Sequence, residues 1–480
     1  MTAHPLPDGL VAFVKRDCPT CVLVEPVLAQ LSQSVGLTVF TQDDPTFPAG
    51  AGEVRHDSDL SMSWHHDIET VPTLVKVADG VEQERIVGWS RPQWIEFTGA
   101  DGLGPDLPEW RPGCGSLSVD PNLADELRVR FSGSTLRARR VDFAALEDEI
   151  EAMYDRGWSD GLPLVPPTEG RVLAMLEGTD RPPDSVVAIA PPDLVEVTVE
   201  KVAINAVMAG CKPEYLPVVL AAVEAACTDR FNMHGLLATT MPAGPVVIVN
   251  GPIRDQIGMN SGKNVMGQGN RANATIGRAL QLVIRNVGGG RPGEVDRATH
   301  GQPGKLSFCF AEDEEGSPWQ PLCSDFGHEA GTNTVSLFAG NGVTCVVDQL
   351  SRDPDSLAAS LAQALIGSNH PKLVLGFDAM IVMGPEHARV FAEAGWTKQQ
   401  TRDRIIELTK RDGAELVRGA GGIAEGLPEA FAEAKAIPKV KPEDGLMIVH
   451  AGGGAGLFSQ LIGGWVNGAK GSAPICHPIS

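Results

Sequence analysis

Apolar residues in this chain occur in short runs that alternate with amphipathic segments. Residues 10–14 and 246–249 are runs with the length and β-branched content of buried strands. In residues 22–31 and 274–284, apolar side chains return every three or four positions, as in helices that pack one face on a core. This alternation predicts an α/β fold.

Three segments of the larger C-terminal part share one pattern. Residues 246–252, 379–385 and 446–453 each contain an apolar strand followed by a glycine-bearing turn. We expect a large α/β domain with internally repeated strand–turn–helix units. A strand that is apolar on both faces is covered on both sides, and the turn after it lies at the carboxyl edge of the sheet, where α/β proteins bind ligands.

Glycine and proline mark a boundary near residue 100. The stretch 99–113 is rich in both and lacks an apolar period, which is typical of a linker. The sequence therefore predicts a first domain over residues 1–98 and a large α/β catalytic domain over residues 114–480. A further division of the large domain into two subdomains would fall near residues 290–330.

Composition and charge narrow the class of protein. Hydrophobic residues make up 42% of the 480 residues and charged residues 21%, as in a globular chain. The net charge of -22 would repel a phosphate backbone, so nucleic acid is excluded as a partner. No apolar run approaches the roughly 20 residues of a membrane span. Because the N-terminus also lacks the pattern of a signal peptide, we expect a cytoplasmic protein without a membrane partner.

Cys18 and Cys21 form a CxxC pair between the first strand and the first helix. At the N-terminus of a helix, unpaired N–H groups and the helix dipole stabilise a thiolate on Cys18, and Cys21 can close a disulfide with it. The pair would then alternate between dithiol and disulfide. Half of a zinc site, or two inert thiols, are the alternatives for this pair.

Residues 5–98 resemble the thioredoxin fold. Besides the CxxC sequence Cys18-Pro19-Thr20-Cys21, the resemblance rests on Pro26 in the following helix and on residues 71–74, Val-Pro-Thr-Leu. It implies that Pro72 forms the cis-proline turn that faces the disulfide. The sequence departs from the family at Asp17, where thioredoxins usually have tryptophan, and at Pro19-Thr20, where they usually have Gly-Pro.

Polar side chains in the large domain mark a candidate binding site for a small polar or anionic substrate. Asn250, His387 and His450 follow their strands at similar positions and could converge, although each could instead cap a helix or complete a turn. The glycine-rich loop 258–273 precedes a helix, whose free N–H groups suit an anion. Its candidate ligand-binding side chains are those of Asn260, Asn264, Asn270 and Arg271. The loop matches no nucleotide-binding pattern, and a structural crossover is the alternative.

Several cysteines outside the CxxC pair are candidates for redox chemistry. Cys323 and His328 lie in one loop-like segment, and a nearby imidazole favours a reactive thiolate. Cys114, between two glycines, is the next candidate. Cys211, Cys227 and Cys345 lie in apolar surroundings, so we expect them to be packing residues.

These observations favour a redox enzyme. The first domain would supply reducing equivalents to an oxidised cysteine of the large domain, Cys323 or Cys114, for thiol-dependent reduction or sulfur transfer. An external thiol reductant is a possible partner. The first alternative is a metal-dependent lyase or hydrolase using some of His234, His328, His387 and His450 with Glu386. The second is a non-enzymatic, redox-responsive binding protein. No cofactor is predicted beyond a possible metal ion, and the substrate and oligomeric state stay open.

Overall fold

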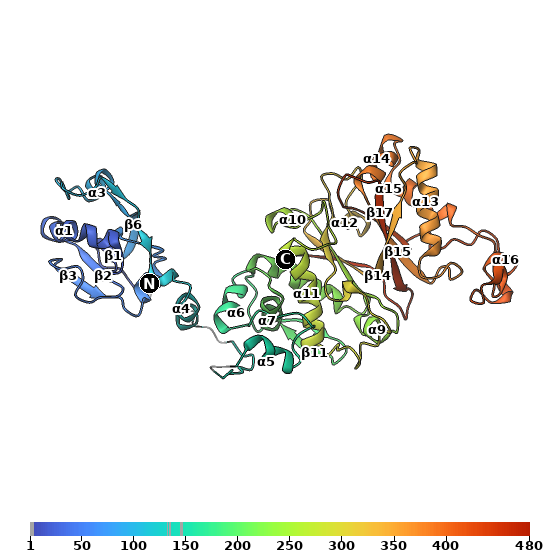
Figure 1. Ribbon diagram of the computed structural model, residues 1–480, viewed down its shortest axis with the longest axis horizontal. Coiled ribbons are helices and arrows are strands. Elements are labelled where there is room, and N and C mark those ends of the chain that lie inside the picture. Colours follow the sequence, from blue (N-terminus) through green and yellow to red (C-terminus); the bar gives the residue numbers. More distant parts are fainter. Residues whose placement is uncertain (1–3, 132, 134–135, 145–146) are drawn as a thin grey trace. The chain divides into compact units, whose positions relative to one another are not determined.

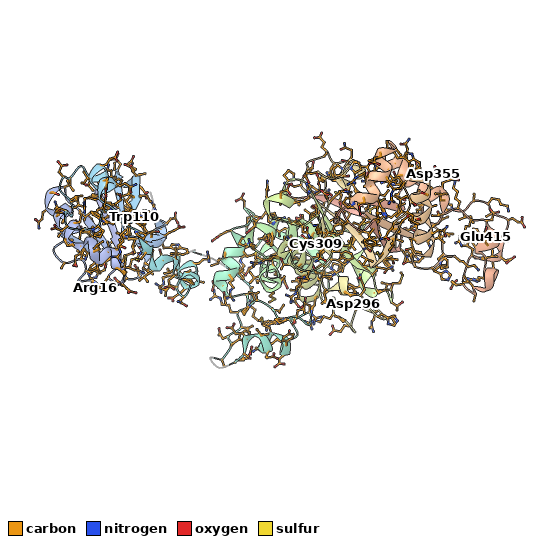
Figure 2. All side chains as sticks on the ribbon, turned by 45° about the horizontal axis from the view of Figure 1, so that its top comes forward. Arg16, Trp110, Asp296, Cys309, Asp355 and Glu415 are labelled. Carbon is orange, nitrogen blue, oxygen red and sulfur yellow. The ribbon has the colours of Figure 1, made fainter. Side chains whose placement is uncertain are left out.

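The computed structural model describes residues 4–131, 133, 136–144 and 147–480. The chain is mixed α/β and divides into two compact units (Figure 1). The first unit comprises Met1–Thr135 with Glu169–Leu173, and the second comprises Leu136–Thr168 with Ala174–Ser480. Within the described ranges, no helix has both the length and the apolar character that a membrane span needs.

The first unit is built around a five-stranded sheet. Its strand order is β3-β2-β1-β5-β6, in which β1, β2 and β3 are parallel and β5 and β6 are antiparallel to their neighbours. The elements in chain order are β1 (Gly9–Val14), α1 (Pro19–Ser34), β2 (Thr38–Thr41), β3 (Glu53–His56), α2 (Ser61–His65), β4 (Thr70–Val71), β5 (Thr73–Ala78), β6 (Val81–Val87), β7 (Trp89–Ser90), α3 (Arg91–Thr98), β8 (Trp110–Arg111), β9 (Cys114–Gly115) and α4 (Ala124–Phe131). The predicted order of strand, CxxC and helix is confirmed by β1 and α1.

The glycine- and proline-rich stretch 99–113 packs on the first unit, so the expected linker is corrected. Leu103 is fully buried in the core of this unit. The indole of Trp89 donates to Pro108 O at 2.6 Å, and β8 pairs with β7. The stretch continues into β9, which pairs with β4. Its turns therefore lead the chain back onto the same unit, and the expected boundary at residue 98 falls inside it.

The second unit contains the remaining strands and most of the helices. They are α5 (Glu149–Asp155), α6 (Glu169–Leu176, divided between the units), β10 (Val186–Ala190), β11 (Val195–Thr198), α7 (Val199–Ala209), α8 (Leu216–Ala226), α9 (Met233–Ala238), β12 (Gly244–Asn250), α10 (Ile253–Gln256), α11 (Arg271–Asn286), β13 (Cys309–Ala311), α12 (Leu322–Asp325), β14 (Thr334–Val347), α13 (Pro354–Gly367), β15 (Phe377–Met383), α14 (Pro385–Glu393), α15 (Lys398–Leu408), α16 (Gly413–Leu416), β16 (Leu446–His450), β17 (Phe458–Val466) and β18 (Ile475–Pro478). Short 3₁₀ turns lie at Leu117–Val119 in the first unit and at Pro213–Tyr215, Pro303–Lys305, Ala420–Gly422 and Glu429–Phe431 in the second.

A mixed sheet forms the centre of the second unit, with the order β13-β12-β14-β17-β15-β16 and β18 beside β14. Helices α13, α14 and α15 cover one face of β15 and β17, as Figure 1 shows. Apolar side chains from β12 to β17 form a separate core on the other face, together with Val265 and Leu322. Because both faces are covered, these strands are apolar at nearly every position, as the sequence indicated.

The expected threefold strand–turn–helix repeat holds only in part. β12, β15 and β16 are the three predicted strands, and α14 follows β15 as expected. After β16, however, the chain runs through a glycine-rich turn into strand β17 rather than into a helix. β12 pairs with the antiparallel strand β14, whereas β15 and β16 are parallel to each other. The sheet is therefore not a simple parallel array.

The sheet curls so that its two end strands meet. β13 and β16 stand at opposite ends of the strand order. Nevertheless, Asp313, just beyond β13, donates its backbone N–H to His450 O at 2.8 Å. Polar residues at the ends of β12, β13 and β16 are thereby brought together, among them Asn250, Glu312 and His450.

Candidate functional site

The CxxC pair lies at the first turn of α1. Cys18 is the N-cap residue of this helix, with Pro19 at its first helical position. The backbone N–H of Cys21 donates to Cys18 Sγ at 3.2 Å. The Cys18 sulfur therefore occupies the place of a capping oxygen and receives a helix N–H that would otherwise lack a partner.

This setting shifts the pKa values of the two thiols in opposite directions. Hydrogen bonds from the side chain of Cys21, then from Cys114 and from the backbone of Cys21 and Thr20, outweigh desolvation and lower the pKa of Cys18 to about 5. Burial, with the charge and hydrogen bond of Cys18, raises the pKa of Cys21 far above its ordinary value. At neutral pH, the Cys18 side chain is therefore a thiolate, whereas Cys21 keeps its proton.

Pro72 lies beside this pair. The Val71–Pro72 peptide bond is cis, as the sequence resemblance implied. Cys18 Sγ lies 3.5 Å from Val71 O, which can accept a hydrogen bond from the thiol when Cys18 is protonated. The residue before the cis-proline is therefore an immediate neighbour of the Cys18 sulfur.

Cys114 belongs to this same site and not to the large domain, where the sequence interpretation placed it. Strand β9 pairs with β4 so that Cys114 lies opposite Val71. Cys114 is one of the groups that lower the pKa of Cys18, and the backbone of Thr20 interacts with both sulfurs. Burial and the neighbouring Cys18 raise the pKa of Cys114. Three cysteines thus form one cluster in the first unit.

The second unit has a cavity of about 430 Å³ at the carboxyl ends of β15 and β16. Its lining comes from the loop before α11, the turn after β16 and the start of β17. The lining residues are Lys263, Asn264, Val265, Met266, Gly267, Val382, Gly384, Ala451, Gly452, Gly453, Ala455, Phe458, Ser459 and Gln460. Among these, Lys263 carries the charge that would attract an anion.

The loop residues predicted to bind a ligand have different roles. Asn264 lines the cavity and donates to Gln268 O. Asn270 caps α11 by accepting from Asn273 N, and Asn260 accepts from Gly262 N. Arg271 donates to Gly210 O at 2.9 Å. Except for Asn264, these side chains hold the loop and the start of α11 in place.

The buried carboxylate of Glu312 lies next to both Asn250 and His450, which approach it with a side chain and a backbone N–H respectively. Asn250 donates to Glu312 Oε2 at 2.6 Å, and His450 N lies 3.5 Å from Glu312 Oε1. Burial raises the pKa of Glu312. Asn250 Oδ1 and His450 Nε2 are both buried without a hydrogen-bond partner. The sequence interpretation missed Glu312, because it belongs to an acidic stretch typical of an exposed loop.

Both ring nitrogens of His387 have hydrogen-bond partners, and neither partner is Glu312. Its Nδ1 lies 2.8 Å from Ser459 Oγ and its Nε2 lies 3.1 Å from Asp348 O. Since a carbonyl accepts only, Nε2 carries the hydrogen and Nδ1 accepts from the serine hydroxyl. His387 therefore contributes to the cavity through Ser459, which lines it, and not as a lining residue.

The structure does not support a reactive thiolate at Cys323. This side chain is fully buried, with Glu329 O 4.0 Å from its sulfur. Burial, followed by the charges of Glu314, Cys476 and Glu312, raises its pKa to about 11. His328 is tied to Cys323 through its backbone N–H, which donates to Cys323 O. Burial and the nearby negative charges therefore disfavour the thiolate that a reactive cysteine requires.

Cys345 was expected in the core and is exposed instead. It lies in β14 directly opposite Gln460 of β17, so both side chains are on the same face of the sheet. Gln460 lines the cavity. Of the other two cysteines expected to pack, Cys211 is buried and Cys227 is half-buried.

The metal-dependent alternative gains no support. In the described part of the chain, no group of three or more histidine, cysteine, aspartate or glutamate side chains is arranged to hold a metal ion. Of its candidate residues, Glu386 accepts from Leu457 N, and His234 is exposed on α9.

Comparison with known proteins identifies no family. No family model matches the chain, and no curated protein matches it. Among solved structures, it is similar to StoA from Bacillus subtilis at 14% sequence identity, with a TM-score of 0.16. The match covers 20% of this chain and 85% of that one.

Proposed function

We propose that the first unit is a thioredoxin-like domain that carries out thiol–disulfide exchange through Cys18 and Cys21. One observation carries the proposal: the Cys18 sulfur caps α1, with its pKa lowered to about 5 by the Cys21 hydrogen bond and the other groups around it. A sulfur that is ionised at neutral pH, beside a second cysteine one helical turn away, has the properties of an exchange nucleophile.

The exchange proceeds in two steps. Cys18 attacks one sulfur of an oxidised partner, forms a mixed disulfide and expels the other partner sulfur as a thiolate. A second cysteine then attacks Cys18 Sγ, which releases the first partner sulfur. The partner gains two electrons and two protons, and the domain is left with one disulfide. An external thiol reductant must restore the dithiol.

The second unit supplies a binding site in this proposal. The cavity at the ends of β15 and β16 has the size of a small-molecule site, and Lys263 and Asn264 line it. A small polar or anionic substrate fits this combination of one cation, an amide and glycine backbone. We propose a redox enzyme that reduces, or transfers sulfur to, such a molecule.

Cys345 replaces Cys323 as the expected electron acceptor within the chain. Cys345 is exposed, and it shares a sheet face with Gln460 of the cavity. The raised pKa of Cys323 keeps it protonated at neutral pH, so it would react slowly with a disulfide.

Trapping the mixed disulfide tests the proposal. The full chain carrying Cys21→Ser and Cys114→Ser is oxidised mildly with glutathione disulfide, and the disulfides of Cys18 are mapped by mass spectrometry. We expect a stable mixed disulfide at Cys18, with Cys345 as a partner. The matched control Cys18→Ser with Cys114→Ser should trap nothing at position 18. Absence of any Cys18 disulfide contradicts exchange, whereas capture of glutathione alone contradicts the relay to Cys345.

A further inference from the structure

Strand β9 places a third cysteine against the nucleophile. Cys114 lies opposite Val71, and Val71 O lies 3.5 Å from Cys18 Sγ. Thr20, in the first turn of α1, interacts through its backbone with both Cys18 and Cys114. Cys114 helps to lower the pKa of Cys18, and Cys18 helps to raise the pKa of Cys114, so the two side chains are near neighbours. Two independent features, a strand pairing and a helix start, therefore converge on this pair of thiols.

Several hydrogen bonds hold the segment that carries Cys114. Thr20 Oγ1 donates to Pro112 O at 2.7 Å on one side of Cys114. On the other side, Ser116 N donates to Glu69 O at 2.9 Å, and the buried Gln42 donates to Ser116 Oγ at 2.6 Å. The segment is thus fixed before and after the cysteine, and Cys114 is held beside Cys18.

Gly113 allows this close approach. A methyl group at position 113 would lie 2.3 Å from Thr70 Cγ2 and 2.9 Å from Val71 O. Val71 O belongs to β4 and cannot move without disturbing the pairing of β4 with β9. Any larger residue at position 113 would therefore displace β9, and Cys114 with it.

The geometry points to Cys114 as a second resolving thiol: it attacks the mixed disulfide on Cys18 and forms a Cys18–Cys114 disulfide. This inference rests on the proposed exchange at Cys18. In the step, the new bond joins Cys114 Sγ to Cys18 Sγ, and the bond between Cys18 and the substrate sulfur breaks. The substrate sulfur leaves as a thiolate and takes up the proton that Cys114 gave up. The oxidant is the substrate disulfide.

Cys114 is more exposed to solvent than Cys21, which favours Cys114 as the resolving thiol. Cys21 is fully buried, and desolvation is the largest cause of its raised pKa. Cys114 is half-buried, so water stabilises its thiolate. Once Cys18 is part of a disulfide, its negative charge is gone, and with it one of the causes that raise the pKa of Cys114. Cys114 then ionises more readily beside the bond that it must attack.

The test uses the full chain with Cys345→Ser, which removes the exposed thiol. Variants with Cys21→Ser, or with Cys21→Ser and Cys114→Ser, are given one equivalent of glutathione disulfide. The fate of Cys18 is followed by acid quenching and peptide mass spectrometry. With Cys114 present, glutathione should leave Cys18 at least about tenfold faster, because the attacking thiol is already in place. The product should be a Cys18–Cys114 disulfide.

Two controls separate the outcomes. Cys21→Ser with Cys227→Ser replaces a half-buried cysteine of the second unit and should behave as Cys21→Ser alone. In the chain that keeps Cys21, a Cys18–Cys114 disulfide should also appear, and Cys114→Ser should remove it while circular dichroism shows an unchanged fold. Glutathione that persists on Cys18 equally with and without Cys114 overturns this inference but leaves exchange at Cys18 intact. If Cys18 takes up no glutathione in any variant, the proposed exchange is overturned and the inference with it.

Discussion

The side chain of Cys18 has two roles that depend on each other. Its sulfur caps α1, and the same capping N–H contributes to the lowered pKa of the thiol. The sequence predicted this because a CxxC pair at a helix start is a local arrangement, readable from a few adjacent residues. It could not predict the position of Cys114 beside this pair, which depends on a strand pairing between distant segments.

The ionisation of Cys18 gives a direct prediction at this scale. Thiolate absorbance near 240 nm in the reduced chain should rise as the pH increases through about 5, the value to which the Cys21 hydrogen bond and its neighbours lower the pKa of Cys18. Cys18→Ser should abolish this rise. Absence of a rise near pH 5, or a rise there that persists in Cys18→Ser, would contradict the assignment of Cys18 as the thiolate.

Among the secondary-structure elements, strand β9 and its pairing with β4 were not predicted from the sequence. Glycine and proline between residues 99 and 113 indicated a linker, because composition does not show where a segment packs. Burial of Leu103 and the pairing of β9 with β4 are tertiary contacts, which composition does not specify. The same limit explains β17, whose apolar pattern is compatible with a strand or with the expected third helix.

Substitution of two neighbouring glycines tests whether β9 limits the access of reagents to Cys18. Cys18 is fully buried, so iodoacetamide should label it slowly in the native chain. Gly113→Ala should speed the labelling several-fold, because the added methyl group meets Thr70 and Val71 and displaces β9.

Gly115→Ala is the matched control, since a methyl group there has open space around it. Labelling of Cys18 is read by peptide mass spectrometry in each variant. Equal rates in Gly113→Ala and Gly115→Ala would show that β9 does not limit access to Cys18.

At the scale of the whole molecule, the chain joins a thiol site in one unit to a cavity in the other. The sequence interpretation proposed ligand contact for the loop before α11, and residues of this loop line the cavity together with the turn after β16. It expected Asn250, His387 and His450 to share one site, but it could not show the curl of the sheet, which brings Asn250 and His450 to Glu312 while His387 binds Ser459. That curl depends on strand pairings that no local pattern encodes.

The cavity predicts binding of an anion through Lys263. Inorganic phosphate should raise the melting temperature of the full chain, and Lys263→Ala should weaken its binding about tenfold, as expected for loss of one charge-assisted hydrogen bond. Gly453→Ala should weaken binding too, because its methyl group would lie 2.8 Å from Lys263 Cγ.

Gly454→Ala serves as the control for the cavity, because nothing lies within 4 Å of the added methyl group. Its phosphate binding should equal that of the unchanged chain. If Lys263→Ala binds phosphate as tightly as Gly454→Ala does, the cavity is not the anion site.

The central claim is that Cys18 and Cys21 form a reversible redox couple. Its most direct test is a redox titration of the full chain in glutathione buffers, with free Cys18 and Cys21 counted by alkylation after acid quenching and unfolding. We expect a Cys18–Cys21 disulfide to form as the buffer becomes more oxidising, and both thiols to return when the buffer is made reducing again. Thiols at both positions that stay free across all buffers, or a disulfide that forms and cannot be reduced, would contradict it.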